Sequence, residues 1–222
     1  MQSRNGWILS GLVIWLGFCS PACAQGLLGT FHVDGQFSTS FLRDSTLSAI
    51  DPSVIGYQSN LNAPLIRRPD LPFGVDVFGR FGGAFLDGQI GTDRFQVTDT
   101  NYSVGTNLYS NEFELVRPWI GMGYLSSTTK QQTTSGGVTS TVRDSSDTFR
   151  FTLGAETLIA ESLAIRTSFD FTFEDTTFQK LRSPRFVAEF VNSPFDHFYF
   201  RIGGSIDFDH NIGILAGAGI KF

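Results

Sequence analysis

The fold class is decided by the stretch Leu163-Ala164-Ile165-Arg166-Thr167-Ser168-Phe169-Asp170-Phe171-Thr172-Phe173-Glu174. Apolar side chains and one threonine occupy its odd positions, and small, polar or charged side chains occupy its even positions. Successive side chains of a β-strand point to opposite faces, whereas a helix repeats every 3.6 residues. The stretch therefore predicts a β-strand with one uncharged face.

The same alternation recurs on both sides of this stretch. The chain is also rich in Phe, Gly, Ser and Thr, which favour strands and turns over helices. Between Leu125 and Phe149 a polar Ser/Thr/Gln-rich stretch predicts a long hairpin or loop. The patterns predict an all-β protein, an antiparallel up-and-down barrel of about eight strands. These strands are expected at 73–81, 93–104, 112–125, 149–156, 163–174, 185–191, 198–207 and 211–222.

Residues 25–72 fit this scheme less well. Phe31 to Phe41 alternates like a strand, but Leu42 to Asp70 has no clear period. Three interpretations stay open: a second strand that makes ten in all, a plug or extension ahead of a barrel at 73–222, or a wrong division of 73–104. An up-and-down membrane barrel made of one bacterial chain has an even number of strands, so a single added strand is disfavoured.

The first 24 residues have the layout of a secretory signal. Arg4 precedes an uncharged stretch whose apolar core, Trp7 to Phe18, is followed by small residues ending at Ala24. That core is shorter than the ~20 residues that a membrane-spanning helix requires. Cleavage after Ala24 is predicted. A membrane anchor and a lipoprotein, whose lipobox would begin at Leu16, are the alternatives.

Both cysteines, Cys19 and Cys23, lie in the predicted signal, so disulfides and cysteine metal sites are excluded for residues 25–222. This segment holds 15 basic and 21 acidic residues without long runs of one sign, which gives no indication of nucleic-acid binding. It also lacks an apolar run near ~20 residues. Insertion into a membrane would therefore require a barrel.

Alternation alone does not say which face points outward. A soluble barrel has its apolar face inside and a membrane barrel has it outside, and both produce a period of two. In a narrow membrane barrel, the charges of both signs would pair across the lumen and fill it. The lumen-facing charges are then expected to be Asp76, Arg80, Arg150, Glu156, Arg166, Asp170, Glu174, Arg201, Asp207 and Lys221.

The C-terminus favours the membrane interpretation. Ile212, Ile214, Ala216, Ala218, Ile220 and Phe222 share one face of the last predicted strand. Gly219-Ile220-Lys221-Phe222 resembles the C-terminal β-signal of bacterial outer-membrane proteins. The resemblance is to small barrels of the OmpA, OmpX and OmpW type and covers roughly Phe73 to Phe222. It implies that Ile220 and Phe222 form an assembly signal recognised by the barrel-assembly machinery.

Two further patterns agree with such a barrel. The long connection after Leu125 and the tight turns near Leu158 and Asn192 fall at opposite ends of the strands, as in outer-membrane barrels. Aromatic residues near predicted strand ends are candidates for interfacial girdles. They are Trp119, Tyr124, Phe195, Phe198 and Tyr199.

Candidate chemistry is sparse. His32, His197 and His210 could serve a lipid-modifying enzyme, but no serine stands in a nucleophile-elbow context. Asp207, Asp209 and His210 could hold calcium in a turn, where acidic residues are also expected for other reasons. We predict no enzyme activity and no catalytic, cofactor or metal site.

The sequence thus predicts a bacterial outer-membrane barrel with a polar, side-chain-filled lumen and a structural or surface-interaction role. Its expected partners are outer-membrane lipid and an unknown surface ligand, contacted through loops such as Ser126 to Asp147. One alternative is a narrow porin-like channel for small solutes. Another is a soluble periplasmic ligand-binding β-barrel.

Overall fold

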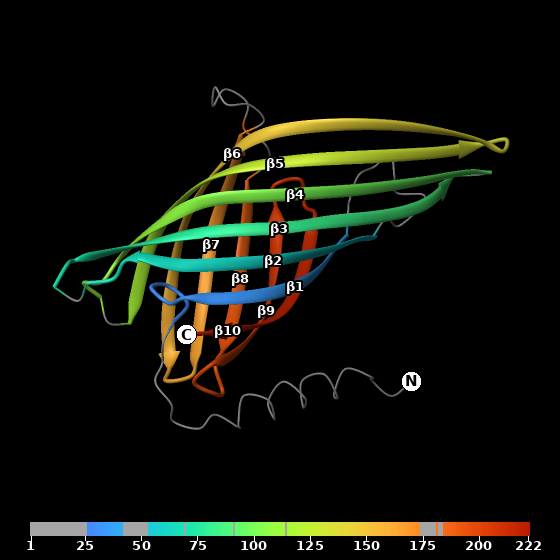
Figure 1. The fold of residues 1–222 in the computed structure, drawn as a ribbon. Coiled ribbons are helices and arrows are strands. Elements are labelled where there is room, and N and C mark those ends of the chain that lie inside the picture. Colours follow the sequence, from blue (N-terminus) through green and yellow to red (C-terminus); the bar gives the residue numbers. More distant parts are fainter. Residues whose placement is uncertain are drawn as a thin grey trace, which may run out of the picture.

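The computed structural model describes residues 26–41, 53–68, 70–90, 92–113, 115–173, 181 and 184–222. Within these residues ten antiparallel strands form one closed barrel, in which chain neighbours pair and β1 closes against β10 (Figure 1). The predicted signal and Glu174 lie outside the described residues. The strands are β1 (His32–Phe41), β2 (Ser53–Ile66), β3 (Phe73–Ile90), β4 (Asp93–Ser110), β5 (Val116–Ser135), β6 (Val138–Ala160), β7 (Leu163–Phe173), β8 (Arg185–Asn192), β9 (Phe198–Asp207) and β10 (Ile212–Lys221).

The all-β barrel fold is confirmed, and of the interpretations left open by the sequence the one with ten strands is correct. The additional pair is β1 and β2, so the barrel begins at His32 rather than at Phe73. β2 escaped the pattern because Val54, Gly56 and Pro64 interrupt its polar inward face, and because Ser59 and Ala63 interrupt its apolar face. Pro64, normally a strand breaker, lies where the register with β3 shifts.

The stretch between Leu125 and Phe149 is a continuous β-hairpin. β5 runs on to Ser135 and β6 starts at Val138, and Gly136 and Gly137 make the turn with positive φ angles. Both faces of this hairpin are polar, so hydrophobic alternation ends although its threonines still favour strand. Together with β3 and β4, these strands project past the rest of the barrel (Figure 1).

The two ends of the barrel differ. The turns β6–β7 and β8–β9 lie at the end that also holds Gly26 and Phe222, here called the plug end (Figure 1). The β3–β4 and β5–β6 hairpins extend from the opposite end, here called the hairpin end. An up-and-down barrel with an even number of strands places both of its termini at one end.

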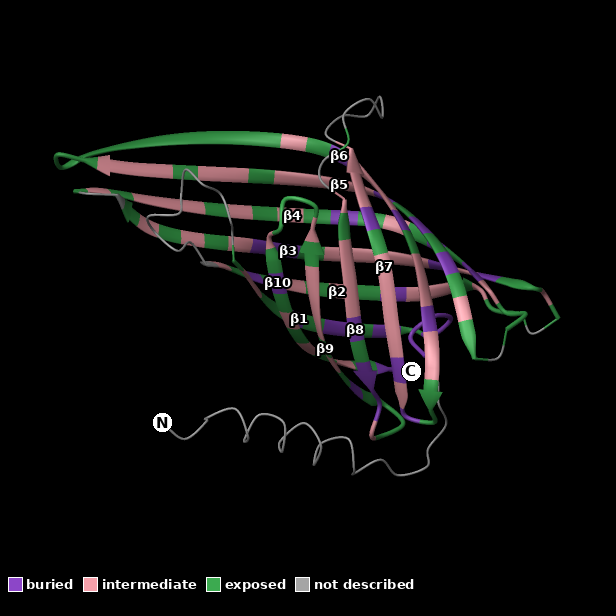
Figure 2. Ribbon diagram, turned by 180° about the vertical axis from the view of Figure 1, so that it is seen from behind, coloured by how far each residue is buried: buried purple, intermediate pink, exposed green. Residues whose placement is uncertain are grey.

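The barrel is apolar outside and polar inside. Along β1 the side chains alternate between exposed Phe37, 72% exposed, and buried Asp34, 3% exposed. Exposed and less exposed positions also alternate along β10, whereas Val138 to Ser145 of β6 are uniformly exposed (Figure 2). Outward positions of β1, β7, β8, β9 and β10 carry no charged residue. A soluble barrel would have the opposite arrangement.

The aromatic residues divide between the two faces. Trp119 and Tyr199 are buried and point inward, so their prediction as girdle residues was wrong. Each belongs to a run of alternating residues, and one position of shift along a strand moves a side chain to the other face. Phe195 and Phe198 are exposed at the plug end. Among the described residues, no helix has the length and apolar character needed to cross a membrane.

Candidate functional site

The segment Gly26–Thr30 lies inside the plug end of the barrel and is here called the plug. Its backbone amides donate to buried carboxylates: Leu27 N to Glu156 Oε2 at 2.9 Å and Gly29 N to Asp76 Oδ2 at 3.0 Å. Asn62 Nδ2 in turn donates to the carbonyl of Thr30 at 3.1 Å. Two strand carboxylates thus accept hydrogen bonds from the backbone of a short segment that lies outside the strands.

Two leucines anchor the plug through apolar contacts. Leu27 packs in a cluster with Tyr199, and Leu28 packs with Tyr109 and Trp119. Burial of a leucine side chain is worth about 1.5–3 kcal/mol, so these contacts add substantially to the hydrogen bonds. The plug end of the lumen is therefore closed by packed side chains and the plug.

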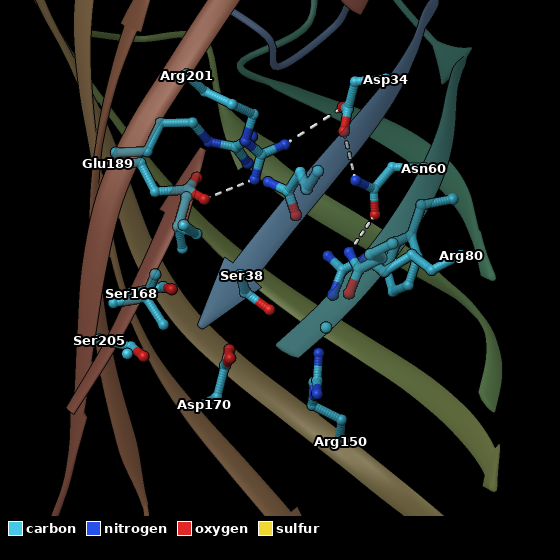
Figure 3. A pocket seen from close by; sticks show the side chains of 18 of the residues that line it. Asp34, Ser38, Asn60, Arg80, Arg150, Ser168, Asp170, Glu189, Arg201 and Ser205 are labelled. Atoms are coloured by element: carbon cyan, nitrogen blue, oxygen red, sulfur yellow. Dashed lines mark hydrogen bonds and ion pairs between the residues drawn. The ribbon is translucent and has the colours of Figure 1, made fainter. Parts of the chain in front are cut away.

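A buried cluster of four side chains lies next to the plug and is here called the clasp. It consists of Asp34, Glu189, Tyr199 and Arg201 (Figure 3 shows all but Tyr199). Arg201 donates to Glu189 Oε1 at 2.6 Å and to Asp34 Oδ2 at 3.2 Å, and Tyr199 donates to the same Asp34 oxygen at 2.6 Å. One cation thus joins strands β1, β8 and β9.

Glycines in β10 make the clasp possible. Gly219 is the register partner of both Asp34 and Tyr199, and a Cβ placed on it would lie 2.5 Å from Tyr199 Cζ and 2.6 Å from Asp34 Cβ. A Cβ on Gly217 would lie 2.6 Å from the carbonyl oxygen of Gly35. Side chains of β1 and β9 therefore meet across β10 only because β10 has no inward side chain at these positions.

Two further ion pairs join neighbouring strands. Glu156 and Arg166 are register partners on β6 and β7, with Nε and Oε2 3.6 Å apart. Asp170 and Arg185 are register partners on β7 and β8 and form a 3.1 Å pair in which the arginine side chain is 45% exposed. The first pair is buried beside the plug, whereas the second is partly open to solvent.

A cavity of about 350 Å³ occupies the lumen above the plug. Ten strands enclose a wider lumen than the eight expected, so the lumen side chains do not fill it. Its lining includes the clasp residues Asp34, Glu189 and Arg201 together with Arg80 and Arg150 (Figure 3). The described lumen is thus packed at the plug end and hollow towards the hairpin end.

The residues predicted to face the lumen fall into distinct places. Asp76 and Glu156 are fully buried beside the plug, and Lys221 is buried at the plug end. Asp207 lies at the hairpin end of β9 and accepts hydrogen bonds from the backbone and side chain of Asn211. The cavity is lined by Asp76, Arg80, Arg150, Arg166, Asp170 and Arg201.

Sequence reasoning missed several charged residues that point into the barrel, among them Asp34, Glu189 and Arg185. It also missed Arg117, which donates to the carbonyl of Leu28 in the plug at 3.4 Å. Glu189 and Arg185 share the inward face of β8, opposite Phe186 and Phe190, so their alternation was visible. Asp34 lies in the alternating run that becomes β1. Its role as the centre of the clasp depends on the closure of β1 against β10, which local patterns do not specify.

The histidines form no catalytic arrangement within the described residues. His32 Nδ1 lies 3.2 Å from the carbonyl oxygen of Thr30, and His197 Nδ1 lies 3.2 Å from that of Lys221. His210 has a φ of 66° in the β9–β10 turn. In the described part of the chain, no three His, Cys, Asp or Glu side chains are placed to hold a metal ion.

The predicted assembly-signal residues lie where the last strand, β10, pairs with the first strand, β1. Phe222 donates its backbone N–H to the carbonyl of Phe31 at 2.8 Å, and the two rings are 5.5 Å apart. Ile220 pairs with Val33 in the register of β10 and β1. Both side chains point outward and are exposed.

Solved structures share this architecture. The beta domain of the Bordetella autotransporter Brka matches with a TM-score of 0.53 and 10% identity, covering 87% of this chain and 100% of that one. The fold is that of an outer-membrane β-barrel.

Lower TM-scores of 0.44 relate the chain to two further structures. Ail, the attachment invasion locus protein of Yersinia pestis, is 13% identical, with 87% of this chain and 99% of that chain covered. The outer-membrane protein OprG from Pseudomonas aeruginosa is 14% identical, with 92% and 98% covered. No family model and no curated protein matches the sequence.

Proposed function

We propose that the chain is exported behind a cleaved signal at residues 1–24 and inserts into a bacterial outer membrane as a plugged barrel. Its role is structural or surface-interacting, with the β3–β4 and β5–β6 hairpins presented outside the cell. The observation that carries the proposal is the apolar exterior of a closed barrel whose charges lie inside.

The exterior matches what lipid requires. An arginine or lysine facing lipid at the bilayer midplane costs about 2–4 kcal/mol, and the outward positions of the shorter strands have none. The closed sheet leaves no unpaired strand edge in the hydrocarbon region. Asp87 and Arg94, an exposed ion pair beyond the apolar residues of β3, lie in the water-exposed extension.

The plug supports a non-conducting role over a porin-like channel. Its amides are held by Glu156 and Asp76, and Leu27 and Leu28 are buried against lumen side chains. A conducting pore would need this segment to leave a site where its hydrogen bonds and apolar contacts are satisfied. In the proposed orientation the plug end faces the periplasm.

The projecting β5–β6 hairpin supports the surface-interaction role. It carries polar side chains on both faces and reaches beyond the other strands (Figure 1). Its backbone is already paired, so a partner would be bound by side chains on a preformed surface.

Single-cysteine labelling tests the proposal directly, because residues 25–222 contain no cysteine. Ser135→Cys places a thiol at the tip of the β5–β6 hairpin, and Glu161→Cys places one in the β6–β7 turn at the plug end. We expect a membrane-impermeant maleimide to label the Ser135 variant in intact cells and the Glu161 variant only after permeabilisation. The reverse pattern would overturn the orientation, and recovery in a carbonate-soluble fraction would overturn membrane insertion.

A further inference from the structure

Two partly buried arginines in the lumen, Arg80 and Arg150, form no ion pair with a carboxylate of the described residues. Within the described part of the chain, the Nε of Arg150 also has no hydrogen-bond acceptor. Figure 3 shows both guanidinium groups directed into the same part of the cavity. These arginines contrast with Arg166, Arg185 and Arg201, each of which pairs with a carboxylate.

The aromatic ring of Phe78 lies between the strands that carry the two arginines. A Cβ on Gly105 would lie 2.5 Å from Phe78 Cζ and one on Gly123 would lie 3.0 Å from it, so this ring reaches across β4 to β5. The guanidinium of Arg80 lies 4.5 Å above the centre of that ring. Arg150 on β6 is the register partner of Gly123. Phe78 thus extends from β3, which carries Arg80, to β5, the strand that pairs with β6 at Arg150.

Nearby carboxylates are already engaged. Asp170 accepts hydrogen bonds from Thr152 at 2.9 Å and from Arg185 at 3.1 Å. Asp34 accepts from Asn60, Tyr199 and Arg201. This part of the cavity therefore has more guanidinium groups than carboxylates to neutralise them.

We propose that Arg80 and Arg150 form a binding site for a small soluble oxyanion, of the phosphate, sulfate or carboxylate class. A guanidinium presents a planar set of N–H donors that matches the oxygens of these anions. Ser38, Gln58 and Asn60 line the same cavity and add neutral polar groups.

The size and position of the cavity restrict the ligand. A volume of about 350 Å³ admits a phosphate or a small phosphorylated or carboxylated compound. The strands surround the cavity and exclude the acyl chains of a lipid. Since the plug occupies one end, the anion enters from the hairpin end. The site requires no conduction through the barrel, so it stands independently of the proposed function.

Calorimetric titration of the detergent-folded protein with inorganic sulfate and phosphate, and with acetate as the carboxylate probe, tests the site at constant ionic strength. We expect saturable binding with one anion per barrel. In a separate series at higher sodium chloride concentration, the affinity should be lower. Arg80→Gln and Arg150→Gln should each weaken binding about tenfold or more, because each removes a charge-assisted contact. Arg143→Gln, which removes a charge from the exposed part of β6, is the matched control and should bind like the unaltered chain.

A second measurement guards against misfolded variants. Gel mobility with and without boiling identifies folded barrels, and sulfate should raise the thermal midpoint of the unaltered chain more than that of folded Arg150→Gln. Equal binding by all variants, equal weakening in Arg143→Gln, or no saturable binding by the unaltered chain would each overturn the proposed site.

Discussion

The two ends of this barrel differ in how the charged side chains of the lumen are paired. At the plug end, three strand carboxylates have hydrogen-bond partners. Glu156 and Asp76 accept from backbone amides of the plug, and Asp34 accepts from Arg201 and Tyr199. Towards the hairpin end, Arg80 and Arg150 line a cavity and pair with no carboxylate in the described part of the chain. The first arrangement closes the barrel, and the second leaves room and charge for a ligand.

The largest difference between the ends is expected in assembly. Phe222 at the plug end and Phe208 at the hairpin end are similarly exposed, 70% and 68%. Phe222→Ala should greatly reduce the amount of folded barrel in the outer membrane, because we propose that Phe222 belongs to the assembly signal. Phe208→Ala should not. Heat-dependent gel mobility of membrane fractions measures both, and normal insertion of the Phe222 variant would contradict the assembly-signal proposal.

Stability should also differ between the arginines of the two ends. Arg201→Met leaves Asp34 and Glu189 buried without their cation, which should lower the free energy of unfolding by about 3–5 kcal/mol. Arg185→Met breaks a pair that is partly exposed and should cost under about 1 kcal/mol. Urea unfolding in detergent can follow Trp119, the only tryptophan after residue 24.

A triple variant separates charge from packing in this comparison. If unpaired carboxylates cause the loss in Arg201→Met, adding Asp34→Asn and Glu189→Gln should recover most of the stability. An undiminished loss in the triple variant would assign the effect to the packing of Arg201.

Glycine substitutions test the close approach of Tyr199 and Asp34 across β10. Gly219→Ala places a methyl group against Tyr199 and Asp34 and should cost about 1–3 kcal/mol. Gly35→Ala is the matched control, because nothing lies within 4 Å of the added atom on the outer face of β1. Equal unfolding midpoints for the two variants would show that Tyr199 and Asp34 do not need the close approach across β10.

The smallest effect is expected for the exposed pair near the β3–β4 turn. The hydrogen bond from Arg94 lowers the pKa of Asp87 below its ordinary value. The stabilisation from this pair is therefore present above the ordinary carboxyl pKa of about 4 and is lost as the pH falls through the lowered value. Since both groups are exposed, Asp87→Asn should leave the urea midpoint at pH 7 unchanged. A clear decrease would place this pair in a less solvated setting than its exposure indicates.

Sequence patterns predicted the strands whose two faces differ most. The residues of β7 and β10 were expected within one or two positions of their observed bounds, because aromatic or aliphatic side chains alternate there with polar residues or glycine. β2 and the outer parts of β5 and β6 were missed. In β2 the apolar outer face is interrupted by Ser59 and Ala63, and in the outer parts of β5 and β6 polar side chains dominate both faces, so the hydrophobic period is weak or absent.

The candidate site was less predictable than the fold, because closure of the barrel creates it. Asp34 and Arg201 are 167 residues apart in sequence and meet only when β1 pairs with β10. The plug follows the predicted signal cleavage site with no strand pattern of its own, and its place is set by two carboxylates on distant strands. Local alternation reports which face a residue occupies but not which residues share the lumen.

Planar-bilayer conductance of the chain beginning at Gln25 tests the central claim, that the plug closes this barrel, most directly. We predict no stable openings for this chain, and openings for a Glu156→Ala, Asp76→Ala variant whose folding is verified by heat-dependent gel mobility, because its plug loses both carboxylate acceptors. Stable openings in the nanosiemens range with the unaltered chain would contradict the claim and favour a channel for small solutes.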